Sequence, residues 1–112
     1  MALRHAMPGE AWDVLPAEPS AASSLSSTIF KSEQLEVVRL VMKAGKSLPP
    51  HKVAGEITIQ CIVGELAVGA LGTTKTLSAG QLLYLPGEAL HDVLAVQDAV
   101  SLVTIALGKR LD

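Results

Sequence analysis

Residues 45–64 read GKSLPPHKVAGEITIQCIVG, and residues 80–91 read GQLLYLPGEALH. Both stretches begin with glycine, and each carries one histidine, His51 and His91. The run from Ile57 to Cys61 alternates apolar and polar residues, which is the period-2 pattern of a half-buried β-strand. Glycine and proline flank the strand-like runs, as they do at turns. The two stretches therefore predict short strands joined by tight turns.

The strand-like pattern extends from Thr28 to the end of the chain. Turn signals recur roughly every eight to twelve residues, a spacing typical of a β-sandwich or barrel. The last run is apolar on nearly both faces, which suits a strand that is buried inside a barrel and covered outside. The predicted strands are Leu35–Lys43, Ile57–Cys61, Leu66–Leu71, Gln81–Leu85, Leu90–Val96 and Ala99–Leu107, with turns at Gly64-Glu65 and Gly72-Thr73-Thr74.

Composition excludes several classes of protein. The 112 residues fit one domain. Apolar residues make up 49% and charged residues 18%, which excludes an acidic disordered chain. The net charge of −2 lacks the basic footprint of a nucleic-acid binder. No apolar run is long enough for a membrane span or a secretory leader, so we expect a cytoplasmic protein with no membrane partner.

The first 26 residues differ from the rest of the chain. They contain Pro8, Pro16, Pro19 and a serine-alanine run, a composition typical of an arm or linker. We therefore expect an N-terminal arm over residues 1–26 and a single β-domain over residues 27–112. The apolar set Trp12, Val14 and Leu15 is either a docking point for this arm or part of a loosely ordered tail.

The two quoted stretches resemble the two motifs of the cupin superfamily, G-x5-H-x-H-x3,4-E-x6-G and G-x5-P-x-G-x2-H-x3-N. The positions that match without a gap are Gly45, His51 and Gly64 in the first motif and Gly80, Pro86 and His91 in the second. The resemblance covers about residues 35–107. It implies an all-β fold, a small RmlC-like jelly-roll β-barrel (double-stranded β-helix) of bacterial type. Small cupins are commonly dimers, so it also implies a homodimer.

The chain departs from the cupin pattern at the metal ligands. In metal-binding cupins the two histidines and the glutamate of the first motif, with the histidine of the second, hold the ion. Here Val53 stands at the second histidine position and Ile57 at the glutamate position. Of the usual four ligands only His51 and His91 remain. Glu88 stands where the second motif has its later glycine.

Strand parity groups these positions on one face. The side chains expected to face the barrel interior, and to line an apolar ligand pocket, are His51, Val53, Ile57, Ile59, His91 and Val93. Glu56 is expected to point to the opposite face, and Tyr84 is expected in the core. His51 and His91 are also the candidate metal ligands, for iron, zinc, nickel or manganese, although protein zinc sites usually have three or four protein ligands.

Three functions remain open from the sequence. The first is a small-molecule-binding cupin in which His51 and His91 orient the polar end of a modest organic ligand. The second is a metal-dependent cupin enzyme, an oxygenase or isomerase, with a reduced two-histidine site. The third is a non-catalytic structural or regulatory dimer. No catalytic residue is assigned, and the cupin fold by itself does not select a reaction.

Overall fold

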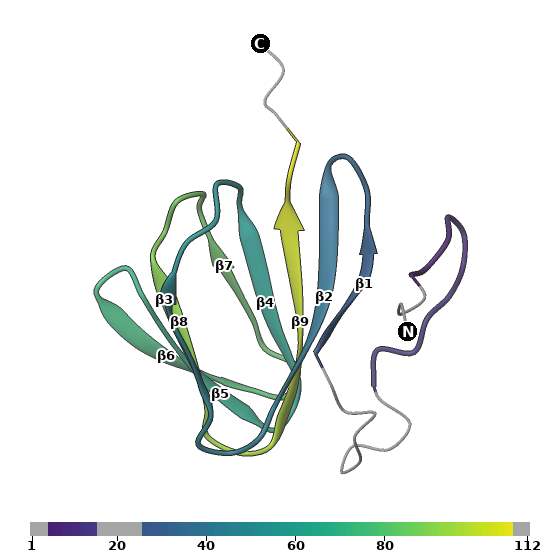
Figure 1. The fold of residues 1–112 in the computed structure, drawn as a ribbon. Coiled ribbons are helices and arrows are strands. Elements are labelled where there is room, and N and C mark those ends of the chain that lie inside the picture. The colour runs from purple at the N-terminus through teal and green to yellow at the C-terminus, as the bar shows by residue number, and fades with distance from the viewer. Residues whose placement is uncertain (1–4, 16–25, 109–112) are drawn as a thin grey trace.

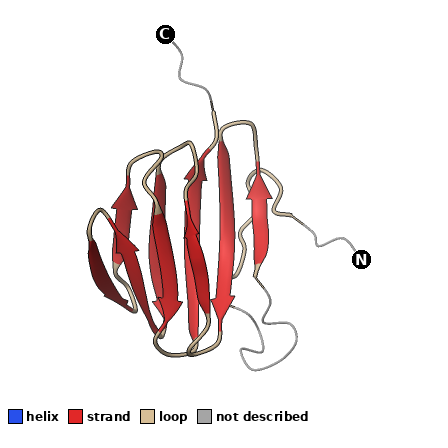
Figure 2. Cartoon of the chain, turned by 60° about the vertical axis from the view of Figure 1, so that its left-hand side comes forward, coloured by secondary structure: helices blue, strands red, loops and turns tan. Residues whose placement is uncertain are grey.

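A computed structural model describes residues 5–15 and 26–108 of the chain. The proline- and serine-rich run expected to link the arm to the barrel, residues 16–25, lies outside the described residues. The described part contains nine strands in two antiparallel sheets that face each other (Figure 1). Within that part there is no helix, and so none that could cross a membrane (Figure 2).

The chain passes back and forth between the two sheets, except that its first two strands, and later its fifth and sixth, are consecutive strands of one sheet. The five-stranded sheet contains, in spatial order, β1 (Ser27–Lys31), β2 (Leu35–Met42), β9 (Ala99–Ala106), β4 (Ile57–Val63) and β7 (Leu82–Leu85). The four-stranded sheet contains, in spatial order, β3 (Ser47–His51), β8 (His91–Ala95), β5 (Glu65–Ala70) and β6 (Thr73–Ser78). The pairs β2–β9, β3–β8, β4–β7 and β5–β6 are nested around the β5–β6 turn. This nesting is the connectivity of a jelly roll, so the predicted fold class is confirmed.

The prediction of a turn at Gly72-Thr73-Thr74 is wrong for the two threonines, which lie in β6. Ala70 pairs with Thr73, so the turn consists of Leu71 and Gly72, and Thr73 opens β6. Both turn residues have positive φ, 53° and 80°, as a two-residue type I′ hairpin requires. The sequence concealed β6 because five of its six side chains are exposed, which leaves no alternation of apolar and polar residues.

The core is aliphatic and lies between the sheets. On β4 the side chains of Ile57, Ile59 and Cys61 are buried, as their shared parity predicts. The central position of β9 between β2 and β4 agrees with the apolar character of its sequence. The buried residues that pack together are Met42, Ile57, Ile59, Cys61, Leu66, Val68, Leu77, Leu85, Val93, Ala95 and Ala99.

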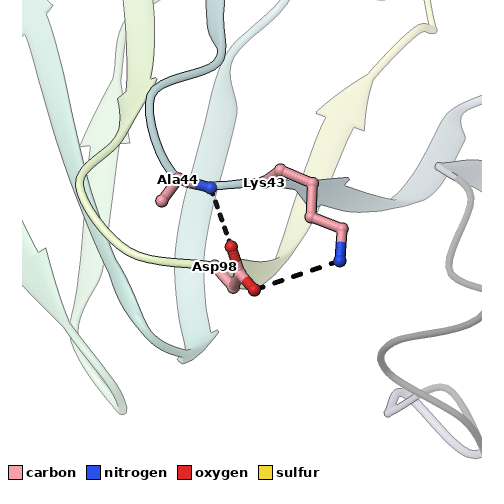
Figure 3. A network of polar contacts seen from close by, with 3 residues as sticks. All are labelled: Lys43, Ala44 and Asp98. Carbon is pink, nitrogen blue, oxygen red and sulfur yellow. Dashed lines mark hydrogen bonds and ion pairs between the residues drawn. The ribbon is translucent and has the colours of Figure 1, made fainter.

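Polar contacts close one end of the barrel, which we call the base. There the β2–β3 turn meets the β8–β9 turn (Figure 3). The carboxylate of Asp98 accepts a hydrogen bond from the backbone N–H of Ala44 at 2.8 Å and lies 4.0 Å from the ammonium of Lys43. A Cβ at Gly64, in the β4–β5 turn, would overlap the carbonyl oxygen of Asp98. The base therefore depends on close backbone packing among three turns.

The described part of the arm contacts the first two strands. The N–H of Ala6 donates to the carbonyl of Ile29 at 2.8 Å, next to the edge of the five-stranded sheet. The guanidinium of Arg39 on β2 donates to the carbonyl of Val14 at 3.2 Å. Trp12 and Val14 are half-buried. These contacts favour the docking interpretation for Trp12 and Val14, whereas Leu15 is 48% exposed.

Candidate ligand site at the barrel mouth

The two histidines meet at the end of the barrel opposite the base, which we call the mouth. His51 is the last residue of β3 and His91 the first of β8. These antiparallel strands pair so that the two residues lie directly opposite each other. Their ring centroids are 4.4 Å apart, with an angle of 54° between the ring planes. The structure therefore brings together the two residues that the sequence had placed 40 positions apart.

Each ring is oriented by a hydrogen bond to a nearby backbone carbonyl. Nδ1 of His51 lies 3.1 Å from the oxygen of Pro49, and Nδ1 of His91 lies 3.0 Å from the oxygen of Ala89. A carbonyl oxygen only accepts, so these hydrogen bonds require the tautomer in which Nδ1 carries the proton. In the neutral imidazole Nε2 then has the free lone pair. In that tautomer the mouth offers two nitrogen acceptors, on rings whose centroids are 4.4 Å apart.

The two rings differ in exposure. His91 is only 4% exposed, whereas His51 is exposed. Parity explains the burial of His91, because Val93 and Ala95 on the same strand are also buried. A bulge between Leu48 and His51 interrupts the regular pairing of β3. In this pair the His91 ring therefore faces the core and the His51 ring faces solvent.

The four predicted apolar pocket residues occupy two environments. Ile57, Ile59 and Val93 are buried members of the core. Val53 is half-buried and packs against that core. It also lines a cavity of about 250 Å³ at the mouth, which neither histidine lines, whereas His91 lines a separate hollow with Pro50 and Leu90. The part of the expected pocket around Ile57, Ile59 and Val93 is therefore filled by core packing, and only the part beside Val53 is open.

Sequence reasoning missed one charged residue of this cavity, Glu36 on β2. It is half-buried and lines the same cavity as Val53. The hydroxyl of Thr28 donates to Oε2 of Glu36 at 3.0 Å. The signal was present in the sequence, because Glu36 has the parity of Leu40 and Met42, which face the core.

Comparison with known proteins settles the fold. No protein-family model matches the chain, and no curated protein matches it. Solved structures do match. An RmlC-like cupin from Desulfovibrio desulfuricans is 27% identical over 97% of this chain and 99% of that one, with a TM-score of 0.69. A Klebsiella pneumoniae protein with a double-stranded β-helix domain is 18% identical over 90% and 92%, with a TM-score of 0.74.

A third match is a conserved protein of unknown function from Streptococcus pyogenes. It is 15% identical over 98% of this chain and 97% of that one, with a TM-score of 0.77. The chain folds as a small cupin domain. The cupin resemblance of the two sequence motifs is thereby confirmed.

The residues at the mouth of this barrel do not fit a resident zinc or iron ion. Zinc sites use three or four protein ligands, and non-haem iron sites use two histidines and a carboxylate. Over residues 5–15 and 26–108, no group of three His, Cys, Asp or Glu side chains lies close enough to hold an ion. At the two remaining cupin ligand positions Val53 and Ile57 offer only hydrocarbon.

The side chains of Glu56 and Tyr84 point away from the barrel interior. Glu56 is exposed and accepts a hydrogen bond from the hydroxyl of Tyr84 at 2.8 Å, as its parity predicts. The hydrogen bond to this carboxylate raises the pKa of the Tyr84 phenol. Tyr84 is 55% exposed, so the expectation that it lies in the core is wrong. It pairs with Thr58 on the outer face of β4, not with the inward-facing Ile57 or Ile59.

Glu88 takes no part in the histidine pair. Its carboxylate lies 3.4 Å from the ammonium of Lys52, and its N–H donates to the carbonyl of Val53 at 2.8 Å. Its φ of 66° explains why the cupin motif has glycine at this position. Glu88 therefore fastens the β7–β8 loop to the β3–β4 loop at the mouth.

Cys61 is a core residue. It is fully buried, and its thiol lies 3.4 Å from the carbonyl oxygen of Gly64. Burial raises the pKa of the thiol, and the negative charge of Glu65 raises it further. The thiolate is the reactive form, so Cys61 lacks the lowered pKa of a nucleophilic cysteine.

Proposed function

We propose that this cupin domain binds a small organic ligand at its mouth, with His51 and His91 holding the polar end of that ligand. One observation carries the proposal. Both rings have their Nδ1 atoms bonded to backbone carbonyls, which leaves the Nε2 atom of each ring as a hydrogen-bond acceptor. Two fixed acceptors side by side suit a hydroxyl, amide or ammonium group, all of which donate hydrogen bonds.

The surroundings of the pair support a partly apolar ligand. The cavity beside Val53 is lined mainly by aliphatic and backbone atoms. Its volume of about 250 Å³ lies just below the roughly 300–1,000 Å³ of drug-sized sites. A ligand of few heavy atoms therefore fits best. Neither histidine lines this cavity, so only the hydrocarbon end of a ligand held by the histidines would lie in it, against Val53 and Ile105.

The first test is thermal melting of metal-free protein, with chelator present, against a panel of five-carbon compounds. The panel contains 3-methylbutan-1-ol, isopentylamine, isovaleramide and isovalerate. We expect at least one compound to stabilise the protein, by about 2.7 kcal/mol at one hundred times its dissociation constant. We expect the His51→Ala/His91→Ala double variant to lose at least tenfold in affinity, and His5→Ala, in the arm, to leave affinity unchanged.

The single variant His51→Ala guards against misfolding, because His51 is exposed whereas His91 is buried. It should keep the melting temperature of the parent and still weaken binding. If no compound stabilises the parent protein, the ligand proposal is overturned. A separate metal analysis uses protein purified without chelator. Near-stoichiometric metal in the parent protein that disappears in the double variant would instead favour the metal-dependent enzyme.

The homodimer stays a prediction. The outer face of the five-stranded sheet supports it, because Val63, Leu82 and Tyr84 expose 43%, 55% and 55% of their surfaces there. A second copy packed on this face would remove that apolar surface from water.

A further inference from the structure

Glu36 lies across the mouth from the histidine pair. In the five-stranded sheet Glu36 pairs with Ile105, and Ile105 pairs in turn with Ile57. The three residues form one row on the inner face of β2, β9 and β4. Neighbouring strands are about 4.8 Å apart, so the backbone of Glu36 is roughly 10 Å from that of Ile57. Glu36 thus lies at the mouth end of the barrel. It does not form a three-residue metal site with the two histidines.

The cavity in front of Glu36 contains one charged side chain and is otherwise aliphatic or backbone. Its walls include Val53, Gly55, Ile105 and Leu107 besides Glu36. Gly55 shapes this wall, because a Cβ there would overlap the carbonyl oxygen of Ala106. A carboxylate that faces an apolar cavity interacts strongly with a charged partner, because less water screens it.

No cation of the described residues neutralises this carboxylate. Its hydrogen bond from Thr28 comes from a neutral hydroxyl. Lys31 is opposite Glu36 in the β1–β2 register, but over residues 5–15 and 26–108 no ion pair joins the two. Lys52, at the same mouth, is paired with Glu88. Within the described residues the negative charge of Glu36 therefore has no ion-pair partner.

We propose that Glu36 binds the cationic group of a small primary amine whose short aliphatic body lies in this cavity. Neither histidine lines the cavity, so this site goes beyond the proposed function of the histidine pair. A carboxylate accepts hydrogen bonds, so it selects a donor. An ammonium is the donor that also satisfies the charge of Glu36.

The test compares isopentylamine, 3-methylbutan-1-ol and isovalerate, which share one hydrocarbon body and differ in the head group. Each is titrated into metal-free protein, and binding is followed by the methyl NMR signals of Val53 and Ile105. We expect isopentylamine to bind at least tenfold more tightly than the alcohol, and isovalerate to bind least. Added salt should weaken the amine and leave the alcohol unchanged.

Glu36→Gln should weaken isopentylamine at least tenfold and leave the alcohol within twofold. Glu33→Gln is the matched control, because it removes the same charge from the exposed β1–β2 turn and should change neither affinity. If the alcohol binds as tightly as the amine, or Glu36→Gln leaves the amine unaffected, the role of Glu36 is overturned while ligand binding at the mouth stands. If none of the three compounds shifts either methyl signal, the cavity takes none of them and the role of Glu36 is overturned, while the histidine pair is tested separately by the thermal melts.

Discussion

Replacing Val53 with histidine should raise the affinity of the protein for zinc roughly 100-fold. Val53 occupies the cupin position of the second histidine, two residues from His51. The variant would therefore add a third imidazole to the pair at the mouth. Three histidines with an open fourth position form a known catalytic zinc arrangement. Both native rings already have the Nδ1–carbonyl hydrogen bond that directs Nε2 toward a metal.

Isothermal titration with zinc measures this gain. Lys52→His is the matched control, because it adds the same imidazole one residue away, on an exposed side chain. We expect it to leave zinc affinity within a few-fold of the parent. Equal affinities for Val53→His and Lys52→His would show that position 53 does not converge with the pair, and the account of the depleted metal site would be wrong.

Gly64→Ala should lower the free energy of unfolding by about 3 kcal/mol. Two costs add at this position. The φ of 83° disfavours any residue with a Cβ, at about 1–2 kcal/mol. The new Cβ would also overlap the backbone oxygen of Asp98, which cannot move without opening the base of the barrel.

Gly80→Ala separates the two costs. Gly80 has a similar φ of 92°, but nothing lies within 4 Å of a Cβ built there. We expect a loss of only about 1 kcal/mol for this variant, from the φ cost alone. Urea denaturation of both variants measures the difference. Equal losses would mean that the β4–β5 turn does not pack against the β8–β9 turn as described.

The sequence predicted the barrel because its determinants are local. Alternation over Ile57–Cys61 marks a strand with one buried face, and the motif glycines fall at turns with positive φ. Strand β6 was not predicted, because its turn and its exposed threonines leave no periodic pattern of apolar residues. The jelly-roll pairing came from the cupin resemblance, since strand pairs such as β2–β9 join residues too far apart for a local pattern to reveal.

The site was predictable only in part. His51 and His91 stood at motif positions, so their convergence was expected and is observed. Glu36 precedes the first motif, and its partner Ile105 is far along the chain, so only the sheet register places it at the mouth. The prediction that Tyr84 lies in the core was wrong, because an aromatic residue in an apolar run resembles a core residue. Its position on the outer face depends on its pairing with Thr58.

The most direct test of the central claim is the tautomeric state of the two histidines. A long-range ¹H–¹⁵N NMR spectrum of metal-free protein, at a pH where both rings are neutral, reports which nitrogen carries the proton. We predict protonated Nδ1 and bare Nε2 for both His51 and His91, with both Nε2 signals shifting when a ligand of the panel is added. Protonated Nε2 in both rings, or ligand binding that leaves both Nε2 signals unmoved, would contradict the account.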